Sequence, residues 1–264
     1  MIGKVILFLC FSLSIISCKK DSTEIYAQSA KDAALGERLI ADVLKQILST
    51  APIFLINEQD SLVNGIILSS KPANSSSAYP KKIIIDYGEG VIGPLGKMRK
   101  GKIIVSVNSG TIIQEDLAVS FDQFNSDGSE ILGDLEYVYN DIVSGYMGEI
   151  LNNGISIINA NGTIKFNGTF VLSKTSTSGT LSLADDLYTF TCNTTGIDLN
   201  QTSFSYITSE NHVIDFSCVE YIKSGISVIK PNNKAVQTIN FGSGKCDANA
   251  VIKLSNGSEK NFIF

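Results

Sequence analysis

The chain has 264 residues, of which 44% are hydrophobic and 18% charged, and its formal net charge is −5. This apolar fraction excludes wholesale disorder, and the length suits one large all-β domain or two small ones. The acidic balance argues against nucleic acid and against anionic lipid surfaces as partners. Low charge, no Trp and one His are more typical of an extracellular β protein than of a cytosolic enzyme.

The N-terminus predicts an export signal. An apolar run from Val5 to Ile16 follows Lys4 and is shorter than the roughly 20 residues that span a bilayer. The stretch from Ile15 to Cys18 resembles the lipobox of bacterial lipoproteins, which implies removal of residues 1–17 and lipidation of Cys18 by diacylglycerol and a palmitate-type acyl chain. The alternative is an ordinary secretory signal in which Cys18 is incidental.

Residues 18–28 are expected to form a lipidated tether. Lys19-Lys20-Asp21 resembles the charged stretch that marks Bacteroidota lipoproteins for the outer face of the outer membrane; the alternatives are the periplasmic face and a merely solvated tether. Loss of residues 1–17 removes one lysine and no acid, which changes the formal charge to −6. Between Cys18 and Ser29 the chain reaches at most roughly 35–40 Å, so the domain stays near the membrane.

Residues 29–50 predict one amphipathic helix. Apolar residues recur there at spacings of three and four, with Lys31, Asp32, Glu37, Asp42 and Lys45 mostly between them. Pro52 is expected to follow the end of this helix as a stop signal. A partner-binding helix is one interpretation, and packing against the domain's own sheet is the favoured one.

Residues 51–264 predict a mainly β domain, an antiparallel β-sandwich or meander. Turn dipeptides such as Asn64-Gly65 and Asp127-Gly128 suit hairpins, and short connections favour antiparallel pairing. Residues 70–80 are expected to form a loop or linker. The expected strands are β-branched or aromatic runs at 81–87, 102–109, 117–124, 154–159, 163–172, 187–192, 204–208, 212–219, 225–230, 236–241, 250–254 and 261–264.

A weak internal repeat suggests two duplicated β units. The segment from Ile85 to Gly90 aligns with the segment from Ile239 to Gly244, and a strand follows each. The possible halves are residues 80–175 and 180–264.

Three cysteines remain beyond Cys10 and Cys18, and export permits a disulfide. Cys218 with Cys246 is the favoured pair, because Cys246 lies in a Gly-rich turn and Cys218 ends a strand that could reach it. Such a bridge would contribute roughly 3–4 kcal/mol in the loop-entropy model. The alternative is three buried, reduced thiols, including Cys192.

Two motifs resemble ligand sites. The run from Gly88 to Gly93 fits G-x-G-x-x-G, but no helix is expected after it to hold a pyrophosphate, so a β-turn is favoured. Asn125, Asp127 and Glu130 carry the oxygen ligands of a weak calcium site, although the glycine is at the fourth position of the loop where an EF-hand has it at the sixth. A β-turn is again the favoured interpretation.

Catalytic and binding candidates are few. His212 could serve a Ser-His-Asp arrangement, yet no G-x-S-x-G elbow accompanies it, so a strand histidine with a hydrogen-bonded ring is favoured. Paired carboxylates could hydrolyse glycosides, but sequence gives no separations in space. The carboxylate candidates are Asp86, Asp116, Asp122 and Asp215. The basic cluster is Lys97, Arg99, Lys100 and Lys102; a solvated hairpin tip is the favoured interpretation, and a contact with an acidic glycan or a lipid headgroup is the alternative. The tyrosines that would favour a binding surface if exposed are Tyr139, Tyr146 and Tyr206.

Several motifs together resemble a family. Tyr79-Pro80-Lys81, Ile85-Asp86-Tyr87-Gly88, Arg99 through Val105, Phe241 through Asp247 and Asn256-Gly257 are similar to a family of Bacteroidota surface lipoproteins without assigned function. The likeness covers most of the chain from about Ser29 onward. It implies the compartment and the architecture and supplies no catalytic residue.

These observations predict a surface-facing lipoprotein of the outer membrane that acts as a binding, adhesive or structural envelope module. Its expected partners are the membrane, through Cys18, and a glycan or an envelope protein, with no cofactor, no metal apart from the weak calcium candidate, and no nucleic acid. It is not expected to be an enzyme. The alternative is an extracellular hydrolase acting on glycans or peptides.

Overall fold

The computed structural model describes residues 25–56, 61–72, 78–108, 116–140, 145–150, 154–176, 186–218 and 221–264. Within these ranges the chain is mainly β, with one α-helix and an antiparallel sheet, which confirms the fold class predicted from the sequence. The signal peptide, Cys18 and most of the predicted tether lie outside the described residues. No helix in the described ranges has the length and apolar character needed to cross a membrane.

The described elements, in chain order, are α1 Gln28–Ile56, β1 Ser61–Val63, β2 Ile66–Lys71, β3 Lys81–Asp86, β4 Val91–Ile92, a 3-10 turn Pro94–Gly96, β5 Met98–Val107, β6 Leu117–Ser126, β7 Ser129–Leu132, β8 Asp134–Asn140, β9 Gly145–Ile150, β10 Ile155–Asn159, β11 Gly162–Ser176, β12 Leu187–Ile197, β13 Ser203–Asp215, β14 Ile222–Pro231, β15 Gln237–Ser243, β16 Asn249–Leu254 and β17 Glu259–Ile263.

The strands form one continuous antiparallel sheet. Pairing runs from β1 through β2, β3, β5, β6, β8, β9 and β11 and then strand by strand from β11 to β17. β4 pairs with β5, and β7 and β10 make a second connection between β6 and β11. The β11–β12 pair joins the proposed halves 80–175 and 180–264, so both belong to the same sheet.

Predicted turns produce two of the hairpins. Asn64 and Gly65 have φ values of 51° and 85°, and Asp127 and Gly128 have 51° and 86°. Two successive residues with positive φ match the twist of antiparallel strands, which is why Asn-Gly and Asp-Gly favour such turns. The predicted strands at 204–208 and 212–219 are instead one strand, β13, whose pairing with β14 shifts register between Thr208 and Val213.

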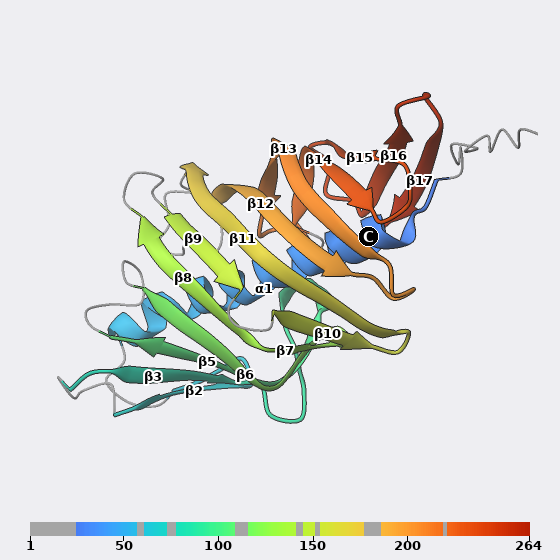
Figure 1. Ribbon diagram of the computed structural model, residues 1–264. Coiled ribbons are helices and arrows are strands. Elements are labelled where there is room, and N and C mark those ends of the chain that lie inside the picture. The colour runs from blue at the N-terminus through green and yellow to red at the C-terminus, as the bar shows by residue number, and fades with distance from the viewer. Residues whose placement is uncertain are drawn as a thin grey trace, which may run out of the picture.

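The helix is longer and more buried than its pattern predicts. It extends from Gln28 to Ile56 and continues past Pro52, where a stop was expected. A proline costs an interior helix one hydrogen bond and about 3 kcal/mol, which an otherwise well-packed helix can tolerate. Figure 1 shows α1 crossing behind the strands along one face of the sheet. The apolar stripe from Ala33 to Leu48 is buried there together with inward residues of the strands.

Candidate functional site

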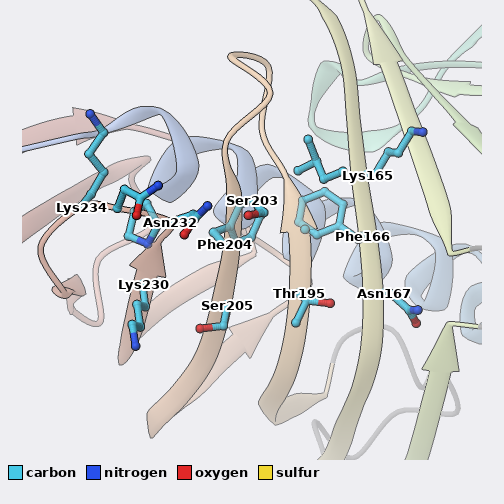
Figure 2. A pocket seen from close by; sticks show the side chains of 14 residues that line it. Lys165, Phe166, Asn167, Thr195, Ser203, Phe204, Ser205, Lys230, Asn232 and Lys234 are labelled. Carbon is cyan, nitrogen blue, oxygen red and sulfur yellow. The ribbon is translucent and has the colours of Figure 1, made fainter.

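Strands β11 to β14 form a groove of about 800 Å³ on the outward face of the sheet. Residues alternate along each strand, so the outward ones lie side by side in rows. One row runs from Asn167 to Thr195 to Ser205 to Lys230, each paired with the next across neighbouring strands. These side chains line the groove, and the hydroxyl groups of Thr195 and Ser205 lie in its middle (Figure 2).

A second row is parallel to the first. Lys165 pairs with Ile197, Ile197 pairs with Ser203, and the Asn232 amide donates to the Ser203 carbonyl at 2.8 Å. Figure 2 shows Lys165 on one flank and Lys230 and Lys234 on the other, with β12 and β13 between them. The groove therefore combines cationic flanks with a neutral floor, in which the Thr195 and Ser205 hydroxyls lie beside apolar groups such as Ile197.

Buried aromatic residues support this floor. Phe166 and Phe204 are each 4% exposed, and their rings meet edge to face with centroids 5.9 Å apart. The Phe166 ring packs so closely against Gly36 of α1 that a side-chain carbon there would overlap it. Gly196 similarly leaves room for the Phe204 ring. The floor of the groove therefore packs directly on the hydrophobic core of the protein.

The segment that enters α1 lies beside the groove. The Tyr26 hydroxyl is 3.1 Å from Thr202 Oγ1, and Lys234 Nζ is 5.2 Å from the centre of the Tyr26 ring. Ser29 donates to Asp198 Oδ2 at 2.7 Å. These contacts fix the start of the helix to the β12–β13 and β14–β15 turns.

A smaller hollow of about 160 Å³ lies between α1 and the β1–β2 hairpin, with Lys45 and Arg99 among its lining residues. Sites for small molecules usually enclose about 300–1,000 Å³. The groove over β11–β14 is within this range and the smaller hollow is below it. We therefore take the groove as the candidate functional site.

Three buried carboxylates connect α1 to the sheet, at Asp32, Glu37 and Asp42. They were predicted between the apolar positions of the helix, but each is at most 4% exposed. Successive carboxylates are five residues apart, which places them about 140° apart around the helix axis. A narrow line at Lys31, Arg38 and Lys45 stays wholly or partly exposed. The sheet therefore covers most of the circumference of the helix, which a single-faced amphipathic pattern does not predict.

Asp32 holds the N-terminal part of the helix. Its carboxylate accepts hydrogen bonds from the Gln28 side chain and from the Leu199 amide, each at 2.9 Å. Burial raises the pKa of Asp32 despite these donors.

Glu37 lies at the centre of a buried network. Its carboxylate contacts Nδ1 of His212 and accepts a hydrogen bond from the Tyr206 hydroxyl at 2.8 Å. Nε2 of His212 is 2.9 Å from Ser227 Oγ. His212 and Ser227 are both fully buried, and a side chain at Gly225 would overlap the imidazole. His212 thus has both ring nitrogens paired, as the sequence analysis favoured.

The connectivity of this network is that of a Ser-His-acid triad, in which the acid orients the imidazole and the imidazole faces the serine. A catalytic serine must reach its substrate, and Ser227 does not line the groove. Cys192 borders the same network, and burial raises the pKa of its thiol well above the ordinary value. The observed burial favours a structural role for all of these groups.

Asp42 has more hydrogen-bonding partners than the other two buried carboxylates of the helix. Arg99 Nη2 is 2.6 Å from Asp42 Oδ1, and Ser126 Oγ and Tyr221 Oη donate to the carboxylate at 2.6 and 2.7 Å. Burial opposes ionisation of this carboxyl, but the Arg99 charge and the hydrogen bonds from Arg99, Ser126 and Tyr221 outweigh it and lower its pKa. Arg99 also donates to Tyr221 Oη at 3.2 Å, so β5 and the residue before β14 meet at the helix.

The prediction of a solvated tip for the basic cluster is wrong for Lys97 and Arg99. Lys97 and Arg99 point inward and are 5% and 3% exposed, whereas Lys100 is exposed and Lys102 pairs with Asp86 at 3.2 Å. Successive side chains along β5 point to opposite faces of the sheet, which separates the buried basic residues from the exposed ones. Lys97 and Lys45 both lie over the Tyr221 ring, at 4.8 and 5.0 Å from its centre. Burial lowers the pKa of Lys45 to about 8.

The calcium candidates form the β6–β7 turn. The Asn125 side-chain oxygen accepts the Gly128 amide at 2.9 Å, and Asn125 pairs with Glu130 across the hairpin. Asp127 is exposed at the turn. The Asn125 side-chain oxygen is therefore hydrogen-bonded to the backbone, as in an ordinary turn.

Cys218 and Cys246 are joined by a disulfide with Cα atoms 5.2 Å apart, the pair that the sequence favoured. Cys192 is free and buried. Asp215 has an oxygen within 4.8 Å of the Cys218 and Cys246 sulfurs, but bonded sulfurs supply no thiolate to a metal ion. Asp215 instead accepts from Ser217 and from Lys223 Nζ, the latter at 3.1 Å.

The remaining candidates are not brought together as a site. The motif from Gly88 to Gly93 runs through a turn into β4 and is followed by the 3-10 turn Pro94–Gly96. Asp116 accepts the Tyr139 amide at 3.2 Å, and Asp122 is exposed on β6. Tyr206, whose exposure would have favoured a binding surface, is 1% exposed.

The groove was not predicted from the sequence. Its residues come from four strands, and only the pairing register places Asn167, Thr195, Ser205 and Lys230 in one row. Alternating polar residues in the predicted strands indicated outward faces, but no single segment shows how those faces combine. No protein family, curated protein or solved structure matches this chain.

Proposed function

We propose that this chain is a lipid-anchored, surface-facing binding module of the outer membrane whose groove over β11–β14 binds a glycan. The observation that supports this function most directly is the row of hydroxyl and amide side chains across the groove, at Asn167, Thr195 and Ser205. Such groups exchange hydrogen bonds with sugar hydroxyls, and a groove open to solvent can accept a long chain.

The position of the groove suits an anchored protein. Tyr26 contacts its rim, and Tyr26 is eight residues after Cys18. Eight extended residues reach at most about 26–29 Å, so an anchor at Cys18 would keep the groove close to the membrane surface. A diacylglyceryl thioether with an N-acyl chain provides the two lipid signals that stable anchoring requires.

The alternative function, an extracellular hydrolase, has one observation in its favour, the chain of contacts from Glu37 through His212 to Ser227. Full burial of His212 and Ser227 counts against it, because a substrate carbonyl has to approach the serine oxygen. We therefore assign these three residues to the core that supports the groove.

The experiment is a binding survey with a variant that fills the groove. The full-length chain, purified in detergent, is tested against immobilised neutral and acidic polysaccharides. Thr195→Trp places a large ring on the floor of the groove, and Thr238→Trp places the same ring on an exposed position of β15 as the matched control. Binding that survives Thr238→Trp and is lost with Thr195→Trp supports the function. Binding equally retained by both variants, or no binding to any glycan, contradicts it.

A further inference from the structure

The charges that line the groove are all of one sign. Lys165, Lys230 and Lys234 are lining residues, and no Asp or Glu is among the lining residues of the described chain. This contrasts with the whole chain, whose formal net charge is −5. Asp198, which follows β12, is fully buried, and its carboxylate accepts from Ser29, Asn200 and Thr202. The positive field of the groove is therefore local.

Two of these lysines keep their charge available. Lys165 and Lys230 are exposed, and neither forms an ion pair within the described residues. Lys234 lies over the Tyr26 ring, which leaves its ammonium donors facing solvent or a ligand. An anion in the groove would meet cations that have no carboxylate partner among the described residues.

The spacing of the lysines indicates the size of the ligand. Lys165 is on β11 and Lys230 is on β14, three strand spacings away, which is roughly 14 Å at about 4.8 Å per spacing. One small anion cannot touch both flanks. A chain that carries acidic groups at intervals can, and its uncharged hydroxyls would then lie over Thr195 and Ser205.

The floor favours a carbohydrate over other polyanions. Single-stranded nucleic acids depend on base stacking against exposed aromatic rings, and the two rings at this groove, Phe166 and Phe204, are 4% exposed. Acidic peptides that add to a sheet need a free strand edge, whereas β12 and β13 are each paired on both sides.

We infer that the ligand of the groove is an acidic oligosaccharide or polysaccharide, with uronate, sulfate or phosphate groups that reach Lys165 on one flank and Lys230 with Lys234 on the other. This inference rests on the proposed function and adds the charge and minimum length of the glycan. The groove lies near the chain segment that follows Cys18, so it could bind acidic glycans of the same membrane surface. Free acidic glycans carry the same groups and are the second source of ligand.

The test uses polygalacturonate and its fully methyl-esterified, uncharged form as matched probes. The full-length chain is titrated with both, in parallel with Lys165→Gln/Lys230→Gln and with Lys82→Gln/Lys260→Gln, which removes two exposed lysines of β3 and β17 outside the groove. We expect the acid form to bind at least about tenfold more tightly than the ester, and the groove double variant to weaken binding by about tenfold. The control double variant should change affinity by less than about twofold, and raising NaCl from about 0.05 to about 0.5 M should weaken binding of the acid form.

The outcomes separate the inference from the proposed function. Equal binding of acid and ester that is still lost with Thr195→Trp overturns the inference and leaves glycan binding in place. Equal weakening by the groove and control double variants also overturns it, since the effect is then one of net charge. Failure to bind either probe or any other glycan contradicts both proposals. A short acidic oligosaccharide and vesicles that carry an acidic glycolipid then separate the free source from the membrane source.

Discussion

Arg99 of β5 and Asp42 of α1 form an almost fully buried ion pair, with Nη2 and Oδ1 2.6 Å apart. Ser126, Tyr221 and Gln46 also donate to the carboxylate, so two strands and the segment before β14 meet at one helical residue. A buried pair with all partners present is tolerated, whereas the loss of one partner leaves an uncompensated charge in the interior. This contact therefore fastens the sheet to the helix.

Asp42→Asn is expected to lower the free energy of unfolding by about 3–5 kcal/mol, because Arg99 remains charged and buried. Urea unfolding followed by circular dichroism measures the change. Asp122→Asn, at an exposed position of β6, is the matched control and should stay within about 0.5 kcal/mol of the wild type. Equal changes in unfolding free energy for the two substitutions would show that the Arg99–Asp42 pair does not stabilise the fold.

The same pair predicts a pH dependence. The folded-state pKa of Asp42 is lowered, so its stabilisation is fully present above the unfolded pKa of about 3.9 and is lost as pH falls through the lower, folded pKa. As pH falls from about 5 to about 2, the unfolding free energy of the wild type should therefore fall more steeply than that of Asp42→Asn. Parallel curves would contradict the predicted ionisation of Asp42.

Ser227 is expected to be inert toward fluorophosphonates that label activated serines, because it and His212 are fully buried. Intact-mass analysis after incubation should show no adduct on the wild type. An adduct that disappears in Ser227→Ala would instead revive the hydrolase hypothesis. A fall in stability of His212→Gln without any change in glycan affinity is the result expected for a core network.

The disulfide is expected to stabilise the fold without contributing to the groove. Cys218→Ala/Cys246→Ala should lower the unfolding free energy by about 3–4 kcal/mol, since the bridge closes a loop with a sequence separation of 28. Glycan affinity of the folded variant should equal that of the wild type. Alkylation of the unfolded, unreduced chain should modify Cys192 and leave Cys218 and Cys246 unmodified; modification of all three would contradict the pairing.

Lipidation of Cys18 is tested by feeding cells a labelled palmitate. The wild-type chain should incorporate the label and partition with membranes, and Cys18→Ala should lose both properties. Cys192→Ala, which removes a buried thiol, is the matched control and should retain them. Incorporation into Cys18→Ala would place the lipid elsewhere or show that the export signal is of the ordinary kind.

Local patterns predicted much of this fold because they report on single segments. Runs of β-branched and aromatic residues identified β3, β5 and β11, and the Asn64-Gly65 and Asp127-Gly128 pairs identified the β1–β2 and β6–β7 turns. The strand β8, Asp134–Asn140, was missed although it alternates, since its acidic residues resemble those of a loop. Strand β13 was divided in two because the polar stretch at residues 209–211 resembles a turn, whereas the register shifts of the sheet absorb it.

The buried carboxylates and the groove could not be read from one segment. Nothing near Asp42 in the sequence shows that Arg99, Ser126 and Tyr221 will meet it, since each comes from a different part of the chain. A helical position that faces solvent in a two-layer fold faces a strand when the sheet curves around the helix. The spacing of Asp32, Glu37 and Asp42 about the helix axis is the one signal that could have indicated such enclosure.

The central claim is that the groove over β11–β14 binds a glycan at the cell surface. The most direct measurement is the binding of a fluorescent acidic polysaccharide to intact cells that express the wild type, Thr195→Trp or Thr238→Trp at equal surface levels. Our account predicts that cells with the wild type and with Thr238→Trp bind the polysaccharide and that cells with Thr195→Trp do not. Equal binding by cells with Thr195→Trp, or no binding by cells with the wild type, would contradict it.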